Sequence, residues 1–561
     1  MAKFISIFRL FFVFLLLLSL GNESFAQHFN WVKYPSCKLP DSPTIAAMEG
    51  WKLGLAEPNK LCFAGVSLHL DSIRFGSHVV TDTTSLFKMF VGKIDSSGSF
   101  VWVRVSDSSD VAPLDVCADS KGNVFLLADF DSLKCNIGGV SVTGEAAKIC
   151  HILCKFDPSG NVAWIKKVAA WSTLSGPFTL PQGGAITLDK YGNIYVGASY
   201  SLPNIVVGGD TLPGYGGTAL IKFDTAGNVL WVKAYSSTAG GYITKIVCDN
   251  NDNVYYLEYR GSGVLVKHNS HGTLIFYNSI GDPVATGMAI DNLGGIYTSG
   301  WFSSDSVRIG SYVVHRNGVY NSAFAKFDTG GHIQWLKSAI GSGNRTYEVS
   351  TDTCGNVFFS GEISNFPWLD SISFDGHSYR YDTTAYGNEY ICQYTNAGTF
   401  ISCFQLAGSG DDISNVLCDN QGHIYLSGDF VTHPNDSLIW GNTILTAPHA
   451  LEYFFVAKYA YDSAACMPYT HHINSIEHVA DIRTNLIYPN PATASVHIHC
   501  PECAPQASNV SLIDMYGRAI IPCTPLSVEY NLKTSDIPDG VYLLKIVNLE
   551  QTETHKIYIS H

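Results

Sequence analysis

Residues 222–231 read Lys-Phe-Asp-Thr-Ala-Gly-Asn-Val-Leu-Trp, and this pattern recurs along the chain. An Asp side chain can accept hydrogen bonds from the backbone amides that follow it, and Gly supplies the positive φ of a tight turn. The flanking residues alternate between apolar and polar, so each copy predicts a hairpin between two half-buried strands. The copies have Asp95/Gly98/Trp102, Asp157/Gly160/Trp164, Asp224/Gly227/Trp231 and Asp328/Gly331/Trp335, with weaker ones at Asn269/Gly272/Phe276 and Thr395/Gly398/Ser402.

A second turn motif, Asp-x-x-Gly-Asn followed by an aromatic residue, alternates with the first. Two alternating hairpins make a four-stranded antiparallel unit, and copies of the first motif lie 45 to 67 residues apart. Four-stranded units at about this period are typical of a β-propeller. The second motif begins at Asp119, Asp189, Asp291, Asp352 and Asp419, with a degenerate copy at Asp249 in which Asp252 replaces Gly.

The repeats predict seven blades. A worn copy of the second motif at residues 59–65 opens the array, and Lys458 ends it without a Trp-bearing strand after it. That missing strand has its match near the start of the chain, at Phe29-Asn-Trp-Val-Lys33. We therefore expect the N-terminal strand to complete the last blade, which closes the ring and removes its open edges. An incomplete ring of six blades is the alternative.

The Lys-Phe-Asp-x-x-Gly-Asn-x-x-Trp copies resemble the SBBP repeats of bacterial propellers over roughly residues 28–462. That resemblance implies the fold and no shared activity. The fold class predicted is all-β, a seven-bladed β-propeller of four-stranded antiparallel blades followed by a small β-sandwich.

The last part of the chain, residues 484–561, follows a polar linker at 463–483 and carries its own motifs. It opens with Tyr488-Pro-Asn-Pro491, continues through Tyr516-Gly-Arg518 and ends near Asp539-Gly-Val-Tyr-Leu-Leu-Lys545. These motifs resemble the type A C-terminal sorting domain of the type IX secretion system. The resemblance implies a Bacteroidota-type protein that contacts the type IX machinery through residues 484–561. It also implies that the body crosses the outer membrane, loses its tail, and stays on the surface or is released.

Residues 1–26 have the pattern of a secretory signal peptide. Lys3 and Arg9 precede a short apolar run, and small residues lead to a cleavage point between Ala26 and Gln27. The run is shorter than the roughly 20 residues of a membrane span, which makes an uncleaved anchor the weaker reading. The propeller is then expected at residues 27–462, secreted or displayed on the outer-membrane surface.

The net charge of −14 argues against nucleic-acid binding, which needs a basic surface. The sequence contains no Gly-x-Ser-x-Gly, His-Glu-x-x-His, P-loop or EF-hand motif. Sialidase Asp-boxes have a turn one residue tighter, and quinone-dependent dehydrogenases have a longer turn and adjacent cysteines. We predict no catalytic residue, metal or cofactor, and a monomer. The metal sites weighed against this are calcium at the repeat Asp residues, His471, His472, Glu477 and His478 in the linker, and zinc at Cys500, Cys503 and Cys523.

The 15 cysteines do not reveal their pairing. Cys117, Cys248 and Cys418 recur just before a repeat Asp, at strand positions where Cys behaves as a small buried hydrophobe. We expect most of the cysteines to be free thiols in the core, with at most one or two disulfides.

If the N-terminal strand is outermost, both turn motifs lie on one face of the propeller and the irregular loops on the other. Irregular loops on a rigid scaffold are where binding usually resides. Aromatic residues interleaved with charged ones suit a glycan or a protein partner, so a non-catalytic binding or adhesion scaffold is the favoured function. A polysaccharide hydrolase or lyase is the alternative, and a structural envelope component the third reading. The candidate ligand-binding residues are Arg345, Tyr347, Trp368, Arg380, Tyr381, Tyr386, Asp411 and Asp412.

Overall fold

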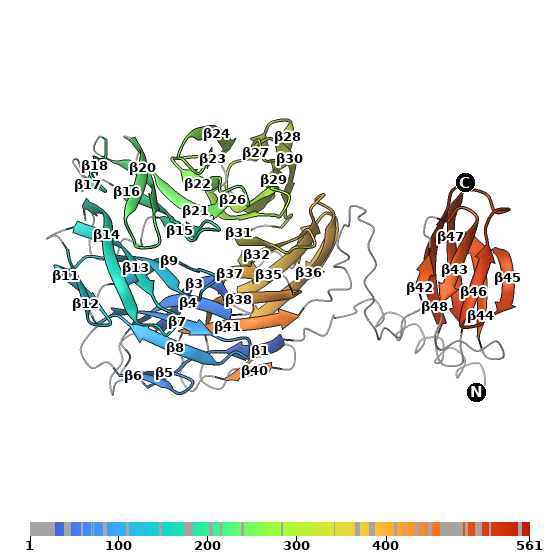
Figure 1. The fold of residues 1–561 in the computed structure, drawn as a ribbon, viewed down its shortest axis with the longest axis horizontal. Helices are drawn as coiled ribbons and strands as arrows, with labels where there is room; N and C mark the ends of the chain where they lie inside the picture. The colour runs from blue at the N-terminus through green and yellow to red at the C-terminus, as the bar shows by residue number, and fades with distance from the viewer. Residues whose placement is uncertain are drawn as a thin grey trace. The chain divides into compact units, whose positions relative to one another are not determined.

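The computed structural model describes residues 29–460 and 486–561 apart from loop segments, the longest of which are 39–46, 173–182, 365–370, 381–386 and 500–507. The chain divides into two compact units, Met1–Tyr469 and Thr470–His561. Their described residues form strands and turns without any helix, so the all-β prediction is confirmed (Figure 1). It follows that no described segment makes a helix long and apolar enough to cross a membrane.

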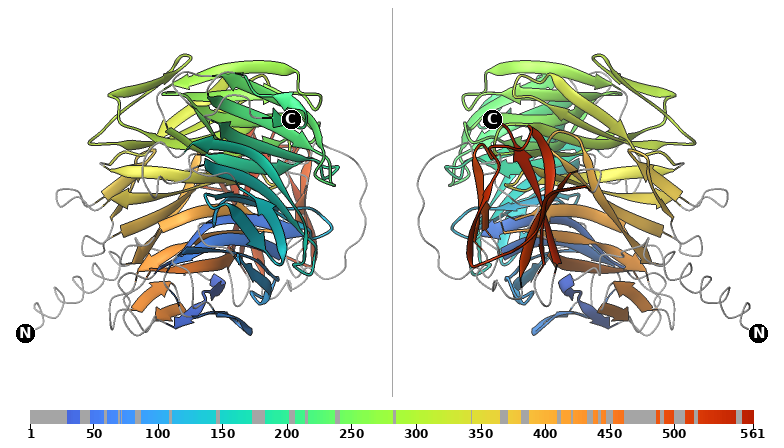
Figure 2. Two further views of the ribbon diagram at one scale, coloured as in Figure 1. Left: turned by 90° about the vertical axis from the view of Figure 1, so that its left-hand side faces the viewer. Right: turned by 90° about the vertical axis from the view of Figure 1, so that its right-hand side faces the viewer.

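The first unit is built from sheets of four antiparallel strands that are arranged radially about a common centre (Figures 1 and 2). The first and the last of these sheets are joined into one eight-stranded sheet by a single parallel pairing of Ala47 with Glu452. From the inner to the outer strand the sheets of four are β3 (Ala47–Glu57), β4 (Lys60–Leu68), β7 (Phe87–Ile94), β8 (Phe100–Val105); β9 (Val111–Ala118), β10 (Val124–Phe130), β13 (Lys148–Phe156), β14 (Val162–Ser172); β15 (Gly184–Leu188), β16 (Ile194–Tyr200), β19 (Gly217–Phe223), β20 (Val229–Ser236); β21 (Tyr242–Cys248), β22 (Val254–Tyr259), β23 (Gly263–His268), β24 (Leu274–Gly281); β25 (Val284–Ile290), β26 (Ile296–Phe302), β29 (Asn321–Phe327), β30 (Ile333–Ser338); β31 (Asn344–Thr351), β32 (Asn356–Ser364), β35 (Gly387–Thr395), β36 (Phe400–Gly408); β37 (Asp412–Cys418), β38 (His423–Val431), β41 (Glu452–Ala460) and β1 (Phe29–Lys33).

The inner strands contact one another in chain order, and the last of them, β37, contacts the first, β3. This order closes the ring and makes the unit a β-propeller. The second strands β10 and β16 are buried along their whole length, because each is covered on both faces by neighbouring sheets. The count of seven blades stays a prediction, which this strand order supports.

The N-terminal strand β1 pairs antiparallel with β41, at the outer edge of the sheet that ends the array. Trp31 lies opposite Lys458 in the register in which Trp231 lies opposite Lys222. Nε1 of Trp31 also donates a hydrogen bond to the carbonyl oxygen of Ser96, in a turn of the first sheet, at 3.1 Å. The N-terminal strand thus connects the last sheet to the first.

The repeat Asp residues cap their own turns. Oδ1 of Asp119 accepts hydrogen bonds from the backbone amides of Lys121 and Asn123 at 3.0 and 2.9 Å, and its Oδ2 accepts one from the Asn123 side chain at 2.6 Å. Gly122 supplies the positive φ of +83°. In the degenerate copy, Asp252 takes the same left-handed conformation at φ +61°. These hydrogen bonds account for the recurrence of Asp at the turns.

Small two-stranded hairpins connect the second and third strands of most sheets. Several of them begin at the Ser of an Asp-Ser-(Ile/Val/Leu) motif, as β27 begins at Ser306. The hairpins that begin in this way start at Ser72, Ser306, Ser371 and Ser437. The hairpins are β5 (Ser72–Phe75) with β6 (His78–Thr81), β11 (Lys134–Ile137) with β12 (Val140–Thr143), β17 (Val206–Val207) with β18 (Asp210–Thr211), β27 (Ser306–Ile309) with β28 (Tyr312–His315), β33 (Ser371–Phe374) with β34 (His377–Arg380) and β39 (Ser437–Trp440) with β40 (Thr443–Thr446), and β2 (Ser36–Lys38) adds to β5.

The second unit has two sheets around its own core. Its inward-facing side chains include Val496, Leu512 and Leu544, all fully buried. This is the architecture of the predicted small β-sandwich. The sheets contain β42 (Leu486–Tyr488), β43 (Ser495–His499) and β46 (Glu529–Lys533), and β45 (Ala519–Pro525), β44 (Asn509–Asp514), β47 (Gly540–Val547) and β48 (Thr552–Ile559).

Most of the described cysteines are free thiols that are fully or partly buried in the propeller, as predicted, among them Cys117, Cys248 and Cys418. Cys354 is disulfide-bonded. Among the described residues, no group of three or more His, Cys, Asp or Glu is placed to hold a metal ion. Cys500, Cys503 and the linker histidines lie outside the described residues, and Cys523 is an exposed free thiol.

Candidate functional site

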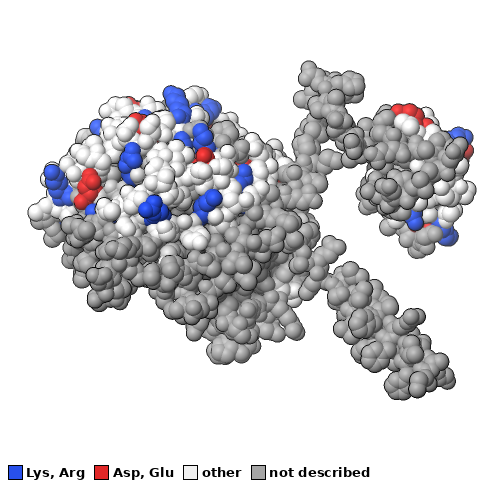
Figure 3. Space-filling model, turned by 90° about the horizontal axis from the view of Figure 1, so that it is seen from below, with Lys and Arg blue, Asp and Glu red and all other residues white. Residues whose placement is uncertain are grey.

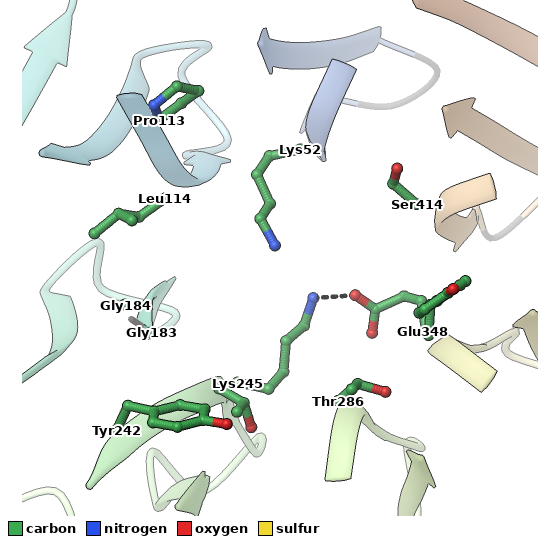
Figure 4. Close-up of a pocket in the computed structure, with 12 residues that line it drawn as sticks. Lys52, Pro113, Leu114, Gly183, Gly184, Tyr242, Lys245, Thr286, Glu348 and Ser414 are labelled. Atoms are coloured by element: carbon green, nitrogen blue, oxygen red, sulfur yellow. Dashed lines mark hydrogen bonds and ion pairs between the residues drawn. The ribbon is translucent and has the colours of Figure 1, made fainter. Parts of the chain in front are cut away.

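A pocket of about 400 Å³ opens at one end of the central channel (Figure 4). Tyr242 is the first residue of β21, and Gly183 directly precedes β15. Since the inner strands end at the Asp turns, the pocket lies at the opposite, loop-bearing end of the channel. The lining residues come from all of the inner strands: Lys52, Pro113, Leu114, Gly183, Gly184, Tyr242, Thr244, Lys245, Thr286, Tyr347, Glu348 and Ser414.

A recurrent β-bulge brings these side chains to the channel. Thr244 is the extra residue between the pairs that Ile243 and Lys245 form with β22. Leu114, Thr286 and Tyr347 take the same place in β9, β25 and β31, and β3 and β37 have a shift at the equivalent point. A bulge re-aims side chains and often lies beside a functional site. Here it breaks the alternation of the inner strands where they enter the channel.

Hydrogen bonds connect the bulges of neighbouring inner strands. Oγ1 of Thr244 donates to the carbonyl oxygen of Ala285 at 3.0 Å, and Oγ1 of Thr286 donates to that of Thr346 at 2.8 Å. Each acceptor is the residue before the bulge of the next inner strand. These hydroxyls therefore support the wall of the pocket and are occupied by the protein itself.

An ion pair crosses the pocket between strands that are not neighbours. Nζ of Lys245 in β21 lies 2.5 Å from Oε2 of Glu348 in β31 (Figure 4). The pair passes over β25, where Gly287 leaves room: a Cβ atom there would stand 2.9 Å from Oε1 of Glu348. Burial alone would lower the pKa of Lys245, but the carboxylates of Glu348 and Asp115 outweigh it and raise that pKa, so Lys245 stays charged.

The second cation of the pocket is Lys52 of β3. Its ammonium points into the pocket towards Lys245 (Figure 4), and it forms no hydrogen bond or ion pair with any described residue. The hydroxyl groups of Ser414 and Tyr242 likewise have no protein partner within the described part of the chain. The ammonium and both hydroxyls are therefore available to a ligand.

The predicted residues Arg345 and Tyr347 lie beside this pocket on β31. Tyr347 lines it. The Arg345 guanidinium lies over two rings, 4.9 Å from the centre of Trp301 and 4.4 Å from that of Tyr320, with Nη1 3.7 Å from Oε1 of Glu362. This stack fixes the guanidinium and leaves about a third of the side chain exposed.

The structure does not bring the other predicted residues into the described site. Trp368, Tyr381, Tyr386 and Asp411 lie outside the described residues, as does the side chain of Arg380 at the end of β34. The side chain of Asp412 is also outside them, although its backbone begins β37 opposite Asp429. Their role as ligand contacts stays a prediction.

Sequence reasoning missed Lys52, Lys245 and Glu348. A signal exists for Lys245 and Glu348, because the residue after the bulge lies four positions before the turn Asp, whereas no repeat Asp follows Lys52 at this spacing. Lys245 precedes Asp249 in this way, and Glu348 precedes Asp352. Counting back from each turn motif would have placed these charged residues at equivalent points of the channel.

Charge elsewhere on the propeller does not gather at another patch in the view of Figure 3. Lys and Arg side chains are spread singly over that side, among mostly uncharged residues. In the pocket, by contrast, Lys52, Lys245 and Glu348 of three inner strands lie together.

Comparisons with known proteins found one protein family and several similar structures. Residues 486–560 match the family described as the secretion system C-terminal sorting domain. Among solved structures, the chain is similar to a protein of unknown function from Bacteroides caccae, at 11% identity over 52% of this chain and 82% of that one, with a TM-score of 0.28. It is also similar to PorZ, a surface component of the type IX secretion system of Porphyromonas gingivalis, at 12% identity over 91% and 75% of the two chains, with a TM-score of 0.29.

The Dos1 propeller is a further similar structure, at 10% identity over 77% of this chain and 95% of that one, with a TM-score of 0.37. No curated protein matches the chain. The sorting domain implies export by the type IX system to the cell surface or the medium. The chain is a β-propeller protein that carries a type IX secretion C-terminal sorting domain.

Proposed function

We propose that the propeller binds an extracellular glycan at the loop-bearing end of its channel and does not transform it. Residues 1–26 direct export to the periplasm and are removed between Ala26 and Gln27. The sorting domain then carries the chain across the outer membrane, and cleavage of this domain leaves the propeller on the surface or releases it. The type IX machinery is the partner for this step.

The observation that carries the proposal is the set of unpartnered polar groups in the pocket. The Lys52 ammonium and the Ser414 hydroxyl face a cavity of about 400 Å³, a volume within the usual range for small-ligand sites. Tyr242 and Tyr347 add aromatic rings, against which the apolar face of a sugar ring can pack. A concave site of this size suits one or two saccharide units better than a protein surface, which buries about 800 Å² per partner.

The Glu348 carboxylate in the pocket already accepts hydrogen bonds from the protein. Oε2 of Glu348 accepts from Lys245, and its Oε1 accepts from the backbone amide of Val349 at 3.2 Å. Glycoside hydrolysis commonly uses two carboxyl groups with separate roles, and Glu348 is the one carboxylate among the described lining residues. We therefore expect a bound glycan to be released without cleavage of a glycosidic bond.

The test presents the purified full chain to a panel of immobilised polysaccharides and scores retention and new reducing ends in the same wells. Substitution of Ser414→Trp fills the pocket, and Leu293→Trp is the matched control, because Leu293 is 82% exposed on a turn at the other end of the blades. The proposal predicts retention without new ends, lost in Ser414→Trp and kept in Leu293→Trp.

Retention that survives Ser414→Trp would place binding elsewhere and overturn the proposal. New reducing ends, absent from the Ser414→Trp variant, would show a hydrolase or lyase instead. Failure to retain any polysaccharide would leave a protein ligand or a structural role, and would also overturn it.

A further inference from the structure

We infer that the pocket selects a glycan carrying a monoanionic group, a uronic carboxylate or a sulfate ester, and that Lys52 pairs with that group. This inference rests on the proposed glycan binding and names the chemical class of the ligand. Its basis is the distribution of charge among the residues that face the pocket.

The charges that line the pocket do not cancel. Lys245 and Glu348 neutralise one another at 2.5 Å, and both oxygens of Glu348 have donors. Lys52 is the remaining charged group of the described lining, and it has no counterion among the described residues. A partly buried ammonium without a counterion is stabilised most by an anionic group of a ligand.

Asp115 is a nearby carboxylate, but it does not act as the counterion of Lys52. It is buried, and its oxygens accept hydrogen bonds from the backbone amides of Val116 at 2.9 Å and Ile186 at 3.0 Å. These bonds hold it in the wall between β9 and β15, and it is not among the residues that line the pocket. Its charge acts on Lys245, which strengthens the contrast between a neutralised Lys245 and an unpaired Lys52.

Neutral donors complete the site. Thr244 and Thr286 already donate to backbone carbonyls, whereas the hydroxyls of Ser414 and Tyr242 are unpaired. Burial raises the pKa of Tyr242, with a further contribution from Tyr259, so its hydroxyl stays protonated and can donate. One cation and two neutral donors complement a group of charge −1, such as a carboxylate or sulfate ester, better than a phosphate dianion.

The experiment is a calorimetric titration of the full chain with three related sugars: trigalacturonate, neutral galactotriose and sulfated galactotriose. The acidic sugars are expected to bind about tenfold more tightly than the neutral one, since a charge-assisted hydrogen bond in a partly buried site contributes about 1.4 kcal/mol or more. Comparison of trigalacturonate with sulfated galactotriose distinguishes a preference for a carboxylate from one for a sulfate ester. The affinity difference is expected to shrink as ionic strength rises.

Substitution of Lys52→Met keeps the length of the side chain and removes its charge. We expect it to abolish the preference for acidic sugars and to leave the affinity for galactotriose within about twofold. Lys121→Met is the matched control, because Lys121 is exposed in an Asp turn at the far end of the blades. An unchanged thermal unfolding midpoint of Lys52→Met verifies that the variant folds.

Equal affinity for all three sugars, or a preference that survives Lys52→Met, would overturn the inference while the proposed glycan binding stands. If the chain retains only the neutral polysaccharides of the panel, the inference is likewise overturned while the proposed glycan binding stands. If no sugar binds and no polysaccharide is retained, the inference and the proposed function both fail.

Discussion

The indole of Trp102 lies so close to Gly160 that a Cβ atom added to Gly160 would stand 2.5 Å from Cδ2 of the ring. Nε1 of the same indole donates to the carbonyl oxygen of Pro158 at 3.1 Å. Trp102 belongs to the outer strand of one sheet and Gly160 to a turn of the next. Gly227 lies against Trp164 in the same way. The Lys-Phe-Asp-x-x-Gly-Asn-x-x-Trp motif therefore joins neighbouring blades as well as the strands within each blade.

This contact predicts that Gly160→Ala costs more stability than its backbone conformation alone explains. Gly160 has φ +81°, where an L-residue loses roughly 1–2 kcal/mol, and the overlap with Trp102 adds about 1–3 kcal/mol. Gly139→Ala is the control, because Gly139 has φ +79° and nothing within 4 Å of an added Cβ. Urea unfolding should show a larger loss for Gly160→Ala, and equal losses would refute the role of the contact.

The buried pair of His151 and Asp129 predicts a pH-dependent contribution to stability. Burial alone would lower the pKa of His151, but the Asp129 carboxylate and its hydrogen bond outweigh this and raise that pKa. A histidine with a raised pKa stabilises the fold fully below about pH 6.5, and this contribution is lost as the pH rises through the raised value. The stability lost in His151→Gln, measured by urea unfolding, should therefore be greatest near pH 5.5 and decline above pH 7. A loss that grows with pH would contradict this account.

His268 predicts the opposite dependence. Burial, with a smaller effect of Lys233, lowers its pKa to about 4, and its Nε2 lies 2.7 Å from the Tyr235 hydroxyl oxygen. The unfolded chain then binds the extra proton between about pH 6.5 and pH 4, so acidification through this range destabilises the fold by on the order of 2 kcal/mol. The stability curve of His268→Gln should be flatter than that of the parent over the same range. A parallel curve would show that folding does not lower the pKa of His268.

The core thiols are predicted to react slowly while the chain is folded. Burial raises the pKa of Cys62 to about 12, with a further contribution from Asp115, so little reactive thiolate forms near pH 8. Cys523 is exposed and supplies the internal comparison. In a titration with Ellman's reagent, Cys523→Ser should remove one fast-reacting equivalent, whereas Cys62→Ser should leave the fast phase unchanged. Loss of a fast equivalent in Cys62→Ser would show that the blades open readily.

The sequence predicted the propeller because its evidence is local. Each turn motif specifies one hairpin through residues within ten positions, as Asp119 does by accepting amides two and four residues on. Repetition of such hairpins then indicates the architecture. The pairing of Trp31 with Lys458 could be anticipated for the same reason, since the strand matches its counterparts residue by residue.

The pocket could not be predicted in this way. Lys245 and Glu348 are 103 residues apart, and they meet because Gly287 lacks a side chain on the strand between them. A bulge also interrupts the alternation of the inner strands, so period-2 reasoning assigns the wrong face beyond it. The stacking of Arg345 on Trp301 and Tyr320 likewise depends on the packing of two neighbouring blades, which brings three separate segments together.

The most direct test of the account is a crystal structure of the chain with the acidic trisaccharide that binds most tightly. We expect the sugar at the loop-bearing end of the channel, with its anionic group within hydrogen-bond distance of Nζ of Lys52 and the Lys245–Glu348 pair intact. A sugar bound elsewhere on the molecule, or one in the pocket with its anionic group turned away from Lys52, would contradict it.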